Sequence, residues 1–346
     1  MSECSSKLSS GRQKKEYYTV DHIVGLSPQM LDLKETLLKV APRNSSVLIT
    51  GESGTGKELF ARALHAASLR RSGPFVKINC AAIPDTLVEA ELFGYEEGAF
   101  TGSRRGGRAG KLELAHRGTV FLDEVAELSC TMQAKLLRFL QEREIQKLGS
   151  TRTILVDVRV IAATNVNLEQ LVKYKKFRDD LFYRLNVVNL HIPPLRERKE
   201  DIPLLVDTFI QKFNHSFGAG ITGVAPEVMN AFLQYPWPGN VRELENCLER
   251  AFNLVDKEEI IQPEHLPAHL GALAVERQLC DEKGLLGHAA VAFKQGRTLA
   301  QIMEDVEKAV VLQALYESKG NKARAAQLLG ISRPGLYKKL IKYSLI

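Results

Sequence analysis

Gly51-Glu52-Ser53-Gly54-Thr55-Gly56-Lys57-Glu58 joins a β-branched run at residues 47–50 to a helical pattern that extends from Leu59 to about Leu69. The glycines of this stretch let the backbone curl until its N–H groups face an anion, and the N-terminus of the following helix adds a positive dipole. This spacing, between a strand and a helix, predicts a phosphate-binding loop. We expect the backbone of Gly51–Glu58 to hold a nucleotide and Lys57 to reach its β- and γ-phosphates.

A second motif follows about 70 residues later, where Val120-Phe121-Leu122-Asp123-Glu124 reads as an apolar strand that ends in two acids. Such acids lie at the carboxyl edge of a parallel sheet, beside the phosphates. We expect Asp123 to hold Mg²⁺ and Glu124 to orient and deprotonate the attacking water. The alternative is that the two acids only cap the next helix.

Glu58 departs from the usual pattern of these loops, in which a Ser or Thr follows the lysine and binds magnesium. The substitution predicts that metal binding shifts toward Asp123, with Thr55 as a further candidate ligand.

The arrangement of strands and helices predicts an α/β fold with a parallel sheet flanked by helices, followed by an all-α region. Apolar density suggests five buried strands, at 47–50, 75–78, 119–122, 158–161 and 187–190. After Pro193-Pro194 the pattern is helical, at about 200–214, 226–234 and 240–254, with no strand pattern. The expected organisation is a loose leader at 1–20, an α/β ATPase subdomain at 21–194, a helical lid at 195–270, a glycine-containing linker at 271–297 and a last unit at 298–346.

Composition places the chain among ordinary globular proteins, because 45% of its 346 residues are hydrophobic and 25% are charged. No apolar run reaches the ~18 residues needed to span a bilayer, and the N-terminus lacks the apolar core of a signal peptide. The five cysteines stand apart without a zinc-binding or CxxC spacing, so a disulfide framework is not expected. These features favour a reducing cytoplasm.

The C-terminal unit is basic and has the pattern of a helix-turn-helix. Residues 319–346 hold seven Lys and Arg side chains and no acid, in a chain of net charge +6. A helix is expected at 299–319 with Thr298 as its N-cap, then helices at 321–329 and 332–341 separated by Gly330. We predict that the unit binds double-stranded DNA. The alternative is a helical oligomerisation module. The DNA-facing candidates are Lys322, Arg324, Ser332, Arg333, Tyr337, Lys338 and Lys339, of which Arg333 and Lys338 are the candidates for base contact.

The chain resembles the AAA+ domain of bacterial enhancer-binding proteins, the ATPases that activate RNA polymerase carrying sigma-54. The resemblance runs from about Ile23 to Leu270 and resumes near Thr298 in a Fis-like domain. It rests on the motifs Gly51–Glu58, Glu91–Gly94, Phe121–Glu124, Phe177–Leu185, Pro193–Arg198 and Trp237–Leu244. In this family Glu is usual at the position of Glu58.

The resemblance implies roles for further residues of the nucleotide site. Asn79 matches a switch asparagine that positions Glu124 according to the nucleotide state, although a strand-end Asn also caps turns. Thr164 and Asn165 match the sensor of the γ-phosphate, and Arg242 matches a second sensor. Arg178 and Arg184 match arginine fingers, with surface salt bridges as the alternative for each. Fingers that act on a neighbouring chain imply a ring, which in this family is a hexamer, with dimers as the DNA-binding unit.

The loop Gly98-Ala99-Phe100-Thr101-Gly102-Ser103 is similar to the loop with which the family contacts sigma-54. Its glycines would act as hinges, and Phe100 is an apolar side chain that a partner can receive. The family usually ends this loop with Ala, so Ser103 adds a hydroxyl group. A second loop, near residues 146–150, is expected to move with the first.

The leading hypothesis is therefore an ATP- and Mg²⁺-dependent transcriptional activator that binds an upstream, enhancer-like DNA site and opens promoters held by sigma-54 RNA polymerase. One alternative is a nucleotide-bound DNA regulator that does not hydrolyse ATP. Another is an AAA+ replication initiator or remodeller with a helix-turn-helix, which the Gly98–Ser103 loop disfavours. Only about 20 residues precede the ATPase, so we expect no phosphoacceptor domain, and control from outside this chain.

Overall fold

The computed structural model describes residues 18–82, 85–99, 106–255, 260–273, 298–318 and 321–343. Nearly all of the expected leader, the linker from residue 274 on, and Phe100, Thr101, Gly102 and Ser103 lie outside the described residues. The chain divides into two compact units. One contains the residues up to Ala219 together with Pro236–Glu249, and the other contains Gly220–Tyr235 and the residues from Arg250 on.

The first unit is built on a parallel sheet of five strands, which confirms the predicted α/β class. Its strands are β1 (Val47–Thr50), β2 (Phe75–Asn79), β5 (Thr119–Asp123), β8 (Arg159–Thr164) and β9 (Val188–His191). They lie in the order β2-β5-β8-β1-β9, and every neighbouring pair is parallel. The carboxyl ends of all five strands therefore meet at one edge, where β1 leads into Gly51 and β5 ends at Asp123.

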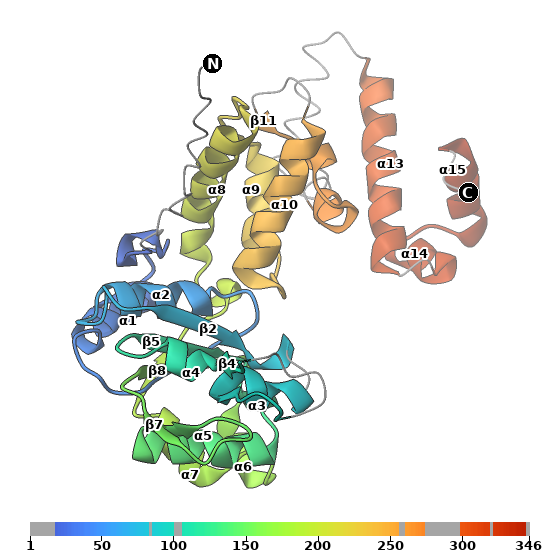
Figure 1. The fold of residues 1–346 in the computed structure, drawn as a ribbon. Coiled ribbons are helices and arrows are strands. Elements are labelled where there is room, and N and C mark those ends of the chain that lie inside the picture. The colour runs from blue at the N-terminus through green and yellow to red at the C-terminus, as the bar shows by residue number, and fades with distance from the viewer. Residues whose placement is uncertain are drawn as a thin grey trace, which may run out of the picture. The chain divides into compact units, whose positions relative to one another are not determined.

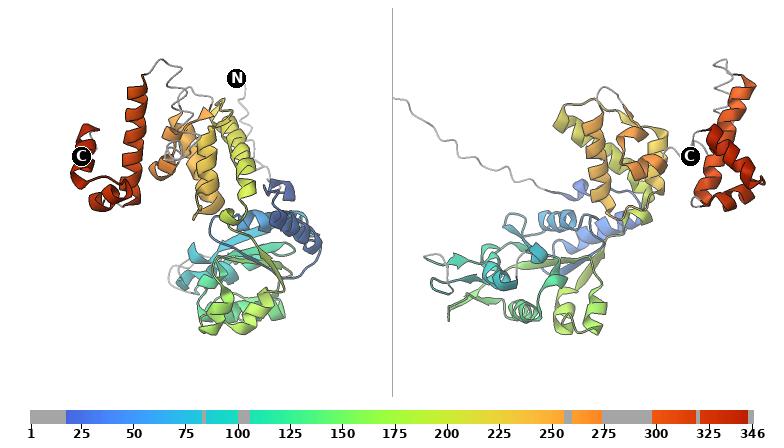
Figure 2. Two further views of the ribbon diagram at one scale, coloured as in Figure 1. Left: turned by 180° about the vertical axis from the view of Figure 1, so that it is seen from behind. Right: turned by 90° about the vertical axis from the view of Figure 1, so that its right-hand side faces the viewer.

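Helices cover both faces of this sheet, and alternate strand residues face two separate cores (Figures 1 and 2). The helices α1 (Pro28–Val40) and α2 (Lys57–Ala66) share a core with Ile49, Phe121 and Ile161. The helices α5 (Cys130–Glu142), α6 (Leu168–Lys173) and α7 (Asp179–Leu185) share the other core with Leu48, Leu122 and Ala162. The three central strands β1, β5 and β8 are buried on both faces, whereas the outer strands β2 and β9 are partly exposed.

The α/β part also contains shorter helices and two small antiparallel strand pairs. They are α3 (Asp85–Phe93), α4 (Lys111–Leu114), the antiparallel pair β3 (Gly94–Tyr95) and β4 (Arg108–Ala109), and the hairpin β6 (Glu144–Gln146) and β7 (Thr153–Leu155). The structure also has 3-10 turns η1 (Val20–His22), η2 (Cys80–Ala82), η3 (Val125–Glu127), η4 (Leu195–Glu197), η5 (Lys199–Asp201) and η6 (Pro263–His265).

Three longer helices follow the sheet, at α8 (Ile202–Phe217), α9 (Pro226–Gln234) and α10 (Asn240–Leu254), close to the predicted ranges. The expectation of helices alone in this region was wrong in one detail. Within the second unit, β10 (Gly223–Val224) pairs in parallel with β11 (Ile260–Ile261). Two-residue strands are too short to show an alternating pattern, and they form here because residues far apart in sequence meet.

The C-terminal region forms the predicted helix-turn-helix from α13 (Leu299–Glu317), α14 (Lys322–Leu328) and α15 (Arg333–Lys342). Thr298 is the N-cap of α13, as expected, and its N–H donates to Gln301 Oε1 at 2.9 Å. Ala325, Ala326, Leu336 and Leu340 are buried with Val311 and Ala314 in a small core. Among the residues that the structure describes, none of the helices combines the length and apolar character that crossing a membrane requires.

Candidate functional site

The phosphate-binding loop leaves β1 at Gly51 and enters α2 at Lys57, the strand–loop–helix context that the sequence predicts. Gly54 and Gly56 have φ angles of +79° and +101°, where a residue with a Cβ is strained. The loop therefore requires glycine at these positions. Among the described residues, no acceptor is paired with the backbone N–H groups of Ser53, Gly54, Gly56 or Lys57. These donors precede the N-terminus of α2 and suit the oxygens of an anion.

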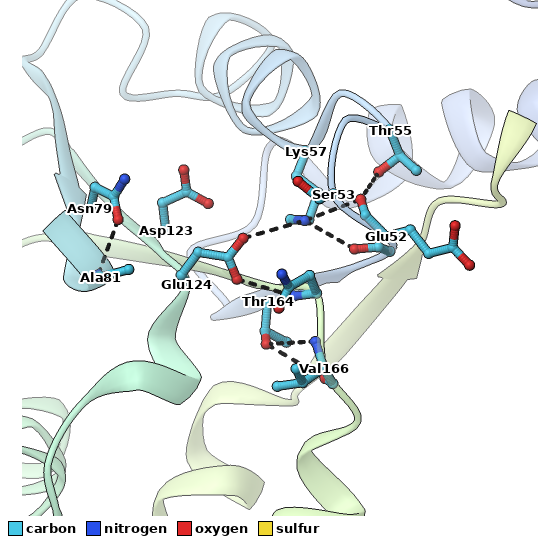
Figure 3. A network of polar contacts seen from close by, with 12 residues as sticks. Glu52, Ser53, Thr55, Lys57, Asn79, Ala81, Asp123, Glu124, Thr164 and Val166 are labelled. Atoms are coloured by element: carbon cyan, nitrogen blue, oxygen red, sulfur yellow. Dashed lines mark hydrogen bonds and ion pairs between the residues drawn. The ribbon is translucent and has the colours of Figure 1, made fainter. Parts of the chain in front are cut away.

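Lys57 is held at the centre of the loop, with 7% of its surface exposed. Its Nζ donates to the carbonyl oxygen of Gly51 at 2.9 Å and to that of Glu52 at 3.3 Å, and lies 3.7 Å from Glu124 Oε1 (Figure 3). Burial lowers the pKa of Lys57, and the negative charges of Glu124 and Asp123 oppose this effect. The ammonium group is thus surrounded by oxygen atoms, as a site for a phosphate-binding cation requires.

Asp123 and Glu124 stand at the end of β5, and the backbone turns sharply between them and η3. Glu124 has a φ of +53° and a ψ of +51°, a left-handed conformation that costs a non-glycine residue ~1–2 kcal/mol. The turn places Glu124 between Lys57 and the end of β8, where its Oε2 accepts from the N–H of Asn165 at 3.2 Å. Strain of this kind is often retained at functional sites. Glu124 is positioned as a general base would be.

Glu58 is already bound by two cations. Arg62 Nε donates to its Oε1 at 2.8 Å and Lys77 Nζ to its Oε2 at 2.5 Å. Burial acts to raise the pKa of Glu58, but hydrogen bonds from Lys77 and Arg62 outweigh it and lower the pKa. Lys77, which the sequence analysis did not single out, also lies 3.6 Å from Asp123 Oδ2. The hydroxyl of Thr55 donates to the Glu52 carbonyl at 2.8 Å within its own turn.

Of the two predicted magnesium ligands, Asp123 fits the metal better than Thr55, whose hydroxyl is engaged within its own turn. No cluster of three or more His, Cys, Asp or Glu side chains within the described ranges is suited to hold a metal ion. Mg²⁺ is usually bound by one or two carboxylates together with substrate phosphates and water, so a single carboxylate at the sheet edge meets its needs. Among the ion pairs of the described residues, Asp123 has Lys77 alone as a partner, at a distance longer than a hydrogen bond, so its oxygens suit a metal ion.

Of the predicted switch residue Asn79 and the predicted sensor residues Thr164 and Asn165, only Asn165 forms a hydrogen bond with Glu124 among the described residues. Asn165 reaches it through its backbone N–H, while the Thr164 hydroxyl accepts from the N–H of Val166 at 3.2 Å. Asn79 Oδ1 accepts from the N–H of Ala81 at 3.0 Å, which is the turn-capping alternative. Figure 3 shows Asp123 between Asn79 and Glu124, and no hydrogen bond of the described residues joins these two. The switch role of Asn79 stays a prediction.

The two predicted finger arginines lie at opposite ends of α7. Arg178 is its N-cap and forms a two-pronged pair with Asp180, from Nε at 3.0 Å and from Nη2 at 2.7 Å. Arg184 lies in the last turn, where Nη2 donates to the Leu140 carbonyl at 3.2 Å. Both residues are exposed on the first unit. Neither arginine contacts the phosphate-binding loop of its own chain among the described residues, so a finger role requires another chain.

Arg242, the predicted second sensor, does contact the loop. Its Nη1 donates to Ser53 Oγ and its N–H to the Gly54 carbonyl, each at 3.3 Å. Two neighbouring residues that the sequence analysis missed, Arg196 and Asn240, contact Glu52. Both lie inside motifs quoted for the family resemblance, which was the only sequence signal available for them.

The base of the Gly98–Ser103 loop is joined to the hairpin β6–β7. Leu148 donates its N–H to the Gly94 carbonyl and accepts from the N–H of Glu96, both at 3.0 Å. A Cβ on Gly149 would lie 3.0 Å from Ala99 Cβ, so the two loops are in van der Waals contact. A cavity of about 420 Å³ beside them is lined by Phe93, Phe139, Ile145 and Leu148, among others. Gly98 has a φ of +82°, and a Cβ added to it would have no heavy atom within 4 Å.

The helix-turn-helix presents most of the predicted DNA-facing residues on its surface. Ser332 Oγ accepts from the N–H of Gly335 at 3.2 Å and caps α15. Arg324, Arg333, Tyr337 and Lys338 are exposed, and Lys322 Nζ lies 5.1 Å from the centre of the Tyr337 ring. Lys339 differs, because its ammonium is paired with Glu307 of α13, which also accepts from the hydroxyl of Tyr343. Lys339 therefore holds α15 to α13.

Together, the sheet order, the phosphate-binding loop and the acids of β5 define an AAA+ P-loop NTPase, here joined to a helix-turn-helix. Comparison with known families agrees with this class along the chain. A family described as Sigma-54 interaction domain matches residues 23–191. The AAA+ ATPase lid domain matches residues 196–279, and Bacterial regulatory protein, Fis family, matches residues 302–343.

Individual relatives place the chain more narrowly. It is 46% identical over 324 residues to the regulatory protein AtoC of Escherichia coli (strain K12), covering 94% of this chain and 68% of AtoC. It is 51% identical over 249 residues to the Nif-specific regulatory protein of Herbaspirillum seropedicae, covering 72% of this chain and 46% of that protein. A crystal structure of NtrX from Brucella abortus in complex with ATP superposes with a TM-score of 0.67 at 36% identity, covering 92% of this chain and 68% of NtrX. The chain belongs to the family of sigma-54-dependent transcriptional regulators.

Proposed function

We propose that this chain is an ATP-hydrolysing activator that binds DNA upstream of a promoter and remodels the closed complex of sigma-54 RNA polymerase. The arrangement of Lys57, Glu124 and Asn165 around the phosphate-binding loop is the observation that carries this proposal. It brings a phosphate-binding cation, a general base and a backbone donor from three different elements within hydrogen-bonding or ion-pair distance. A loop that only bound nucleotide would have no need for the strained Glu124.

Each residue of the site has a defined role in hydrolysis. The N–H groups of Ser53, Gly54, Gly56 and Lys57 and the Lys57 ammonium bind the phosphates, and Glu124 accepts a proton from the attacking water. Asp123 would hold Mg²⁺, which, when bound, neutralises charge on the phosphate oxygens. Asn165 keeps the Glu124 carboxylate directed toward the loop, and Arg242 responds to the nucleotide through Ser53 and Gly54.

In this proposal hydrolysis takes place in a ring, because Arg178 and Arg184 serve the site of the neighbouring chain.

 A permanently charged, planar guanidinium suits the charge that grows on the γ-phosphate in the transition state. Both side chains are exposed, and Arg178 would have to exchange Asp180 for the phosphate or for an acid of its neighbour. The family resemblance favours a hexamer.

The Gly98–Ser103 loop is the part that we propose to contact sigma-54, with Phe100 as the apolar contact. Hydrogen bonds between Leu148 and the base of this loop support movement of both loops as one body. Nucleotide turnover at the sheet edge would thus reach the partner through β5, α3 and the hairpin.

The helix-turn-helix would bind DNA through α15, with Arg333 and Lys338 at the bases, and would act as a dimer. Leu299, Met303, Val310 and Tyr316 of α13 are apolar or aromatic and 46–76% exposed. An exposed apolar surface of this kind favours pairing of α13 with a second copy, which suits a palindromic DNA site.

An ATPase assay on two variants tests the enzymatic part of the proposal. Lys57→Ala should abolish nucleotide binding and turnover. Glu124→Gln should still bind ATP but hydrolyse it ~10²–10⁴-fold more slowly, because the general base is lost. Glu127→Gln, an exposed acid three residues further along, is the matched control and should hydrolyse ATP at the wild-type rate.

Unchanged turnover in both site variants would refute the assignment of the site. If the wild-type chain binds ATP and DNA but shows no turnover, in the presence or absence of DNA, the chain is instead a nucleotide-bound regulator without hydrolysis.

A further inference from the structure

The side of the phosphate-binding loop that faces away from Lys57 is hydrogen-bonded to two segments, residues 195–198 and 237–242. We call it the outer side of the loop. Three successive carbonyl oxygens of the loop accept hydrogen bonds from these segments. Asn240 Nδ2 donates to Ser53 at 3.0 Å, the N–H of Arg242 donates to Gly54 at 3.3 Å, and Arg198 Nη2 donates to Thr55 at 3.3 Å. These carbonyl oxygens thus face protein, while the N–H groups of Ser53 and Gly54, which have no acceptor among the described residues, are left for phosphate.

Glu52 adds the only ionic contact to this outer side among the described residues. Arg196 Nη1 donates to its Oε2 at 2.8 Å and Nη2 to its Oε1 at 2.6 Å, and Asn240 Nδ2 donates to Oε2 at 3.2 Å. These hydrogen bonds, first from Arg196 and then from Asn240, lower the pKa of the Glu52 carboxyl group. The two-pronged geometry fixes the orientation of the pair as well as the distance.

Asn240 is fully buried and connects the phosphate-binding loop, the segment at residues 195–198 and the start of α10. Besides donating to Glu52 and Ser53, it accepts from the N–H of Leu195 through Oδ1 at 2.8 Å. Its φ of +53° is a left-handed conformation that Asn and Gly tolerate better than other residues. Asn240 is also the first residue of α10, so any shift of that helix start is transmitted to the loop.

At Gly54, the phosphate-binding loop packs against the start of α10 without room for a side chain. A Cβ on Gly54 would lie 2.2 Å from the carbonyl oxygen of Gly239, which precedes Asn240. The loop and the start of α10 are therefore in direct backbone contact, and the hydrogen bonds of Asn240 act across this contact.

We propose that Glu52, Arg196 and Asn240 form a positioning latch, which holds the phosphate-binding loop in its nucleotide-binding conformation and sets the affinity of this site for nucleotide. The inference rests on the proposed function, because it concerns the same nucleotide site. The three residues act through the loop and take no part in the chemical step. Figure 3 shows the Glu52 carboxylate on the side of the loop away from Lys57 and Glu124.

The latch stabilises the loop before ligand arrives, so its loss should weaken binding more than turnover. Preorganised groups improve affinity by lowering the cost of ordering on binding. Because the Glu52 and Arg196 side chains are each 41% exposed, their ion pair alone should contribute only a small factor. Buried Asn240 should contribute more, since its loss leaves the Leu195 N–H and the Ser53 carbonyl without partners.

The test measures the Kd of a fluorescent, non-hydrolysable ATP analogue and, separately, kcat and KM for ATP, on the full chain. Arg196→Gln should raise Kd about threefold to fivefold. Asn240→Gly, which keeps the left-handed backbone accessible, should raise it about tenfold. For both variants kcat at saturating ATP should stay within about twofold, so that the change appears in Kd and KM. Arg138→Gln breaks an exposed pair with Glu142 elsewhere and is the control that should leave Kd, KM and kcat unchanged.

A charge exchange separates positioning from general destabilisation. Glu52→Arg and Arg196→Glu should each raise Kd, because like charges then face each other, and the double variant should recover affinity to within about threefold of wild type. A double variant as weak as the sum of the single variants overturns the latch, as does a loss that falls on kcat with Kd unchanged. Failure of the wild-type chain to bind nucleotide would instead refute the proposed function, and with it the latch.

Discussion

Gly54→Ala tests how the loop is built, because the new methyl group meets two separate obstacles. The first is backbone strain, since an alanine at a φ of +79° costs about 1–2 kcal/mol. The second is contact, since the Cβ would lie 2.2 Å from Gly239 O whereas carbon and oxygen require roughly 3.5 Å. Gly239 would have to retreat by about 1 Å, enough to break the 3.3 Å hydrogen bond from Arg242 to the Gly54 carbonyl.

Gly56→Ala is the matched control, because it meets only the first obstacle. Its φ is +101°, and the nearest atom to an added Cβ is Leu59 Cδ1 at 3.9 Å, an ordinary van der Waals contact. The control should therefore cost about 1–2 kcal/mol. Gly54→Ala should cost about 3–4 kcal/mol, because the hydrogen bonds of Arg242 and Asn240 to the loop add about 1 kcal/mol each.

Thermal unfolding of the ligand-free chain, followed by circular dichroism, measures the difference. At roughly 2–4 °C per kcal/mol for a domain of this size, the transition should fall about 10 °C for Gly54→Ala and about 5 °C for Gly56→Ala. Equal shifts in the two variants would refute the reasoning, because they would show that the contact between Gly54 and Gly239 does not contribute to stability.

Three further outcomes follow from contacts elsewhere in the chain. Burial, together with the nearby charges of Asp123 and Glu124, raises the pKa of Cys80 to about 12, so native protein treated with a maleimide between pH 7 and 9 should be labelled at exposed Cys130 and not at Cys80. Peptide mapping that finds both thiols labelled equally would contradict this burial. Asn321→Ala removes an N-cap that accepts from two N–H groups of α14 and should destabilise that helix by about 1 kcal/mol, measured as faster amide hydrogen exchange there; unchanged exchange would count against the cap. Arg333→Ala should abolish sequence-specific DNA binding, whereas Lys339→Ala, which breaks the pair with Glu307, should lower thermal stability and leave the salt dependence of DNA binding unchanged; the reverse pattern would show Lys339 to be a phosphate contact.

Local patterns were sufficient to predict the sheet and the helix-turn-helix. The strands at 47–50 and 119–122 are apolar apart from one β-branched threonine each, and the capped helix starts at Thr298 and Ser332 carry their signals within a few residues. The hairpin β6–β7 has strands of only three residues, which are too short to establish an alternating pattern.

The contacts around the loop could not be predicted in this way, because they join distant parts of the chain. Glu52 meets Arg196 and Asn240 across 144 and 188 residues, and no local pattern relates these positions. Lys339 is a second case in which a contact distant in sequence determines the role of a residue. Its charge and its place on a basic helix predicted a DNA contact, whereas the structure pairs it with Glu307, 32 residues earlier.

The central claim is that ATP hydrolysis by this chain drives promoter opening, and formation of open complexes tests it most directly. Sigma-54 RNA polymerase on a cognate promoter should give heparin-resistant, permanganate-reactive complexes when the wild-type chain and ATP are present. The Glu124→Gln variant with ATP, and the wild-type chain with a non-hydrolysable analogue, should give none, although both bind nucleotide. Open complexes formed equally well without hydrolysis would contradict the account.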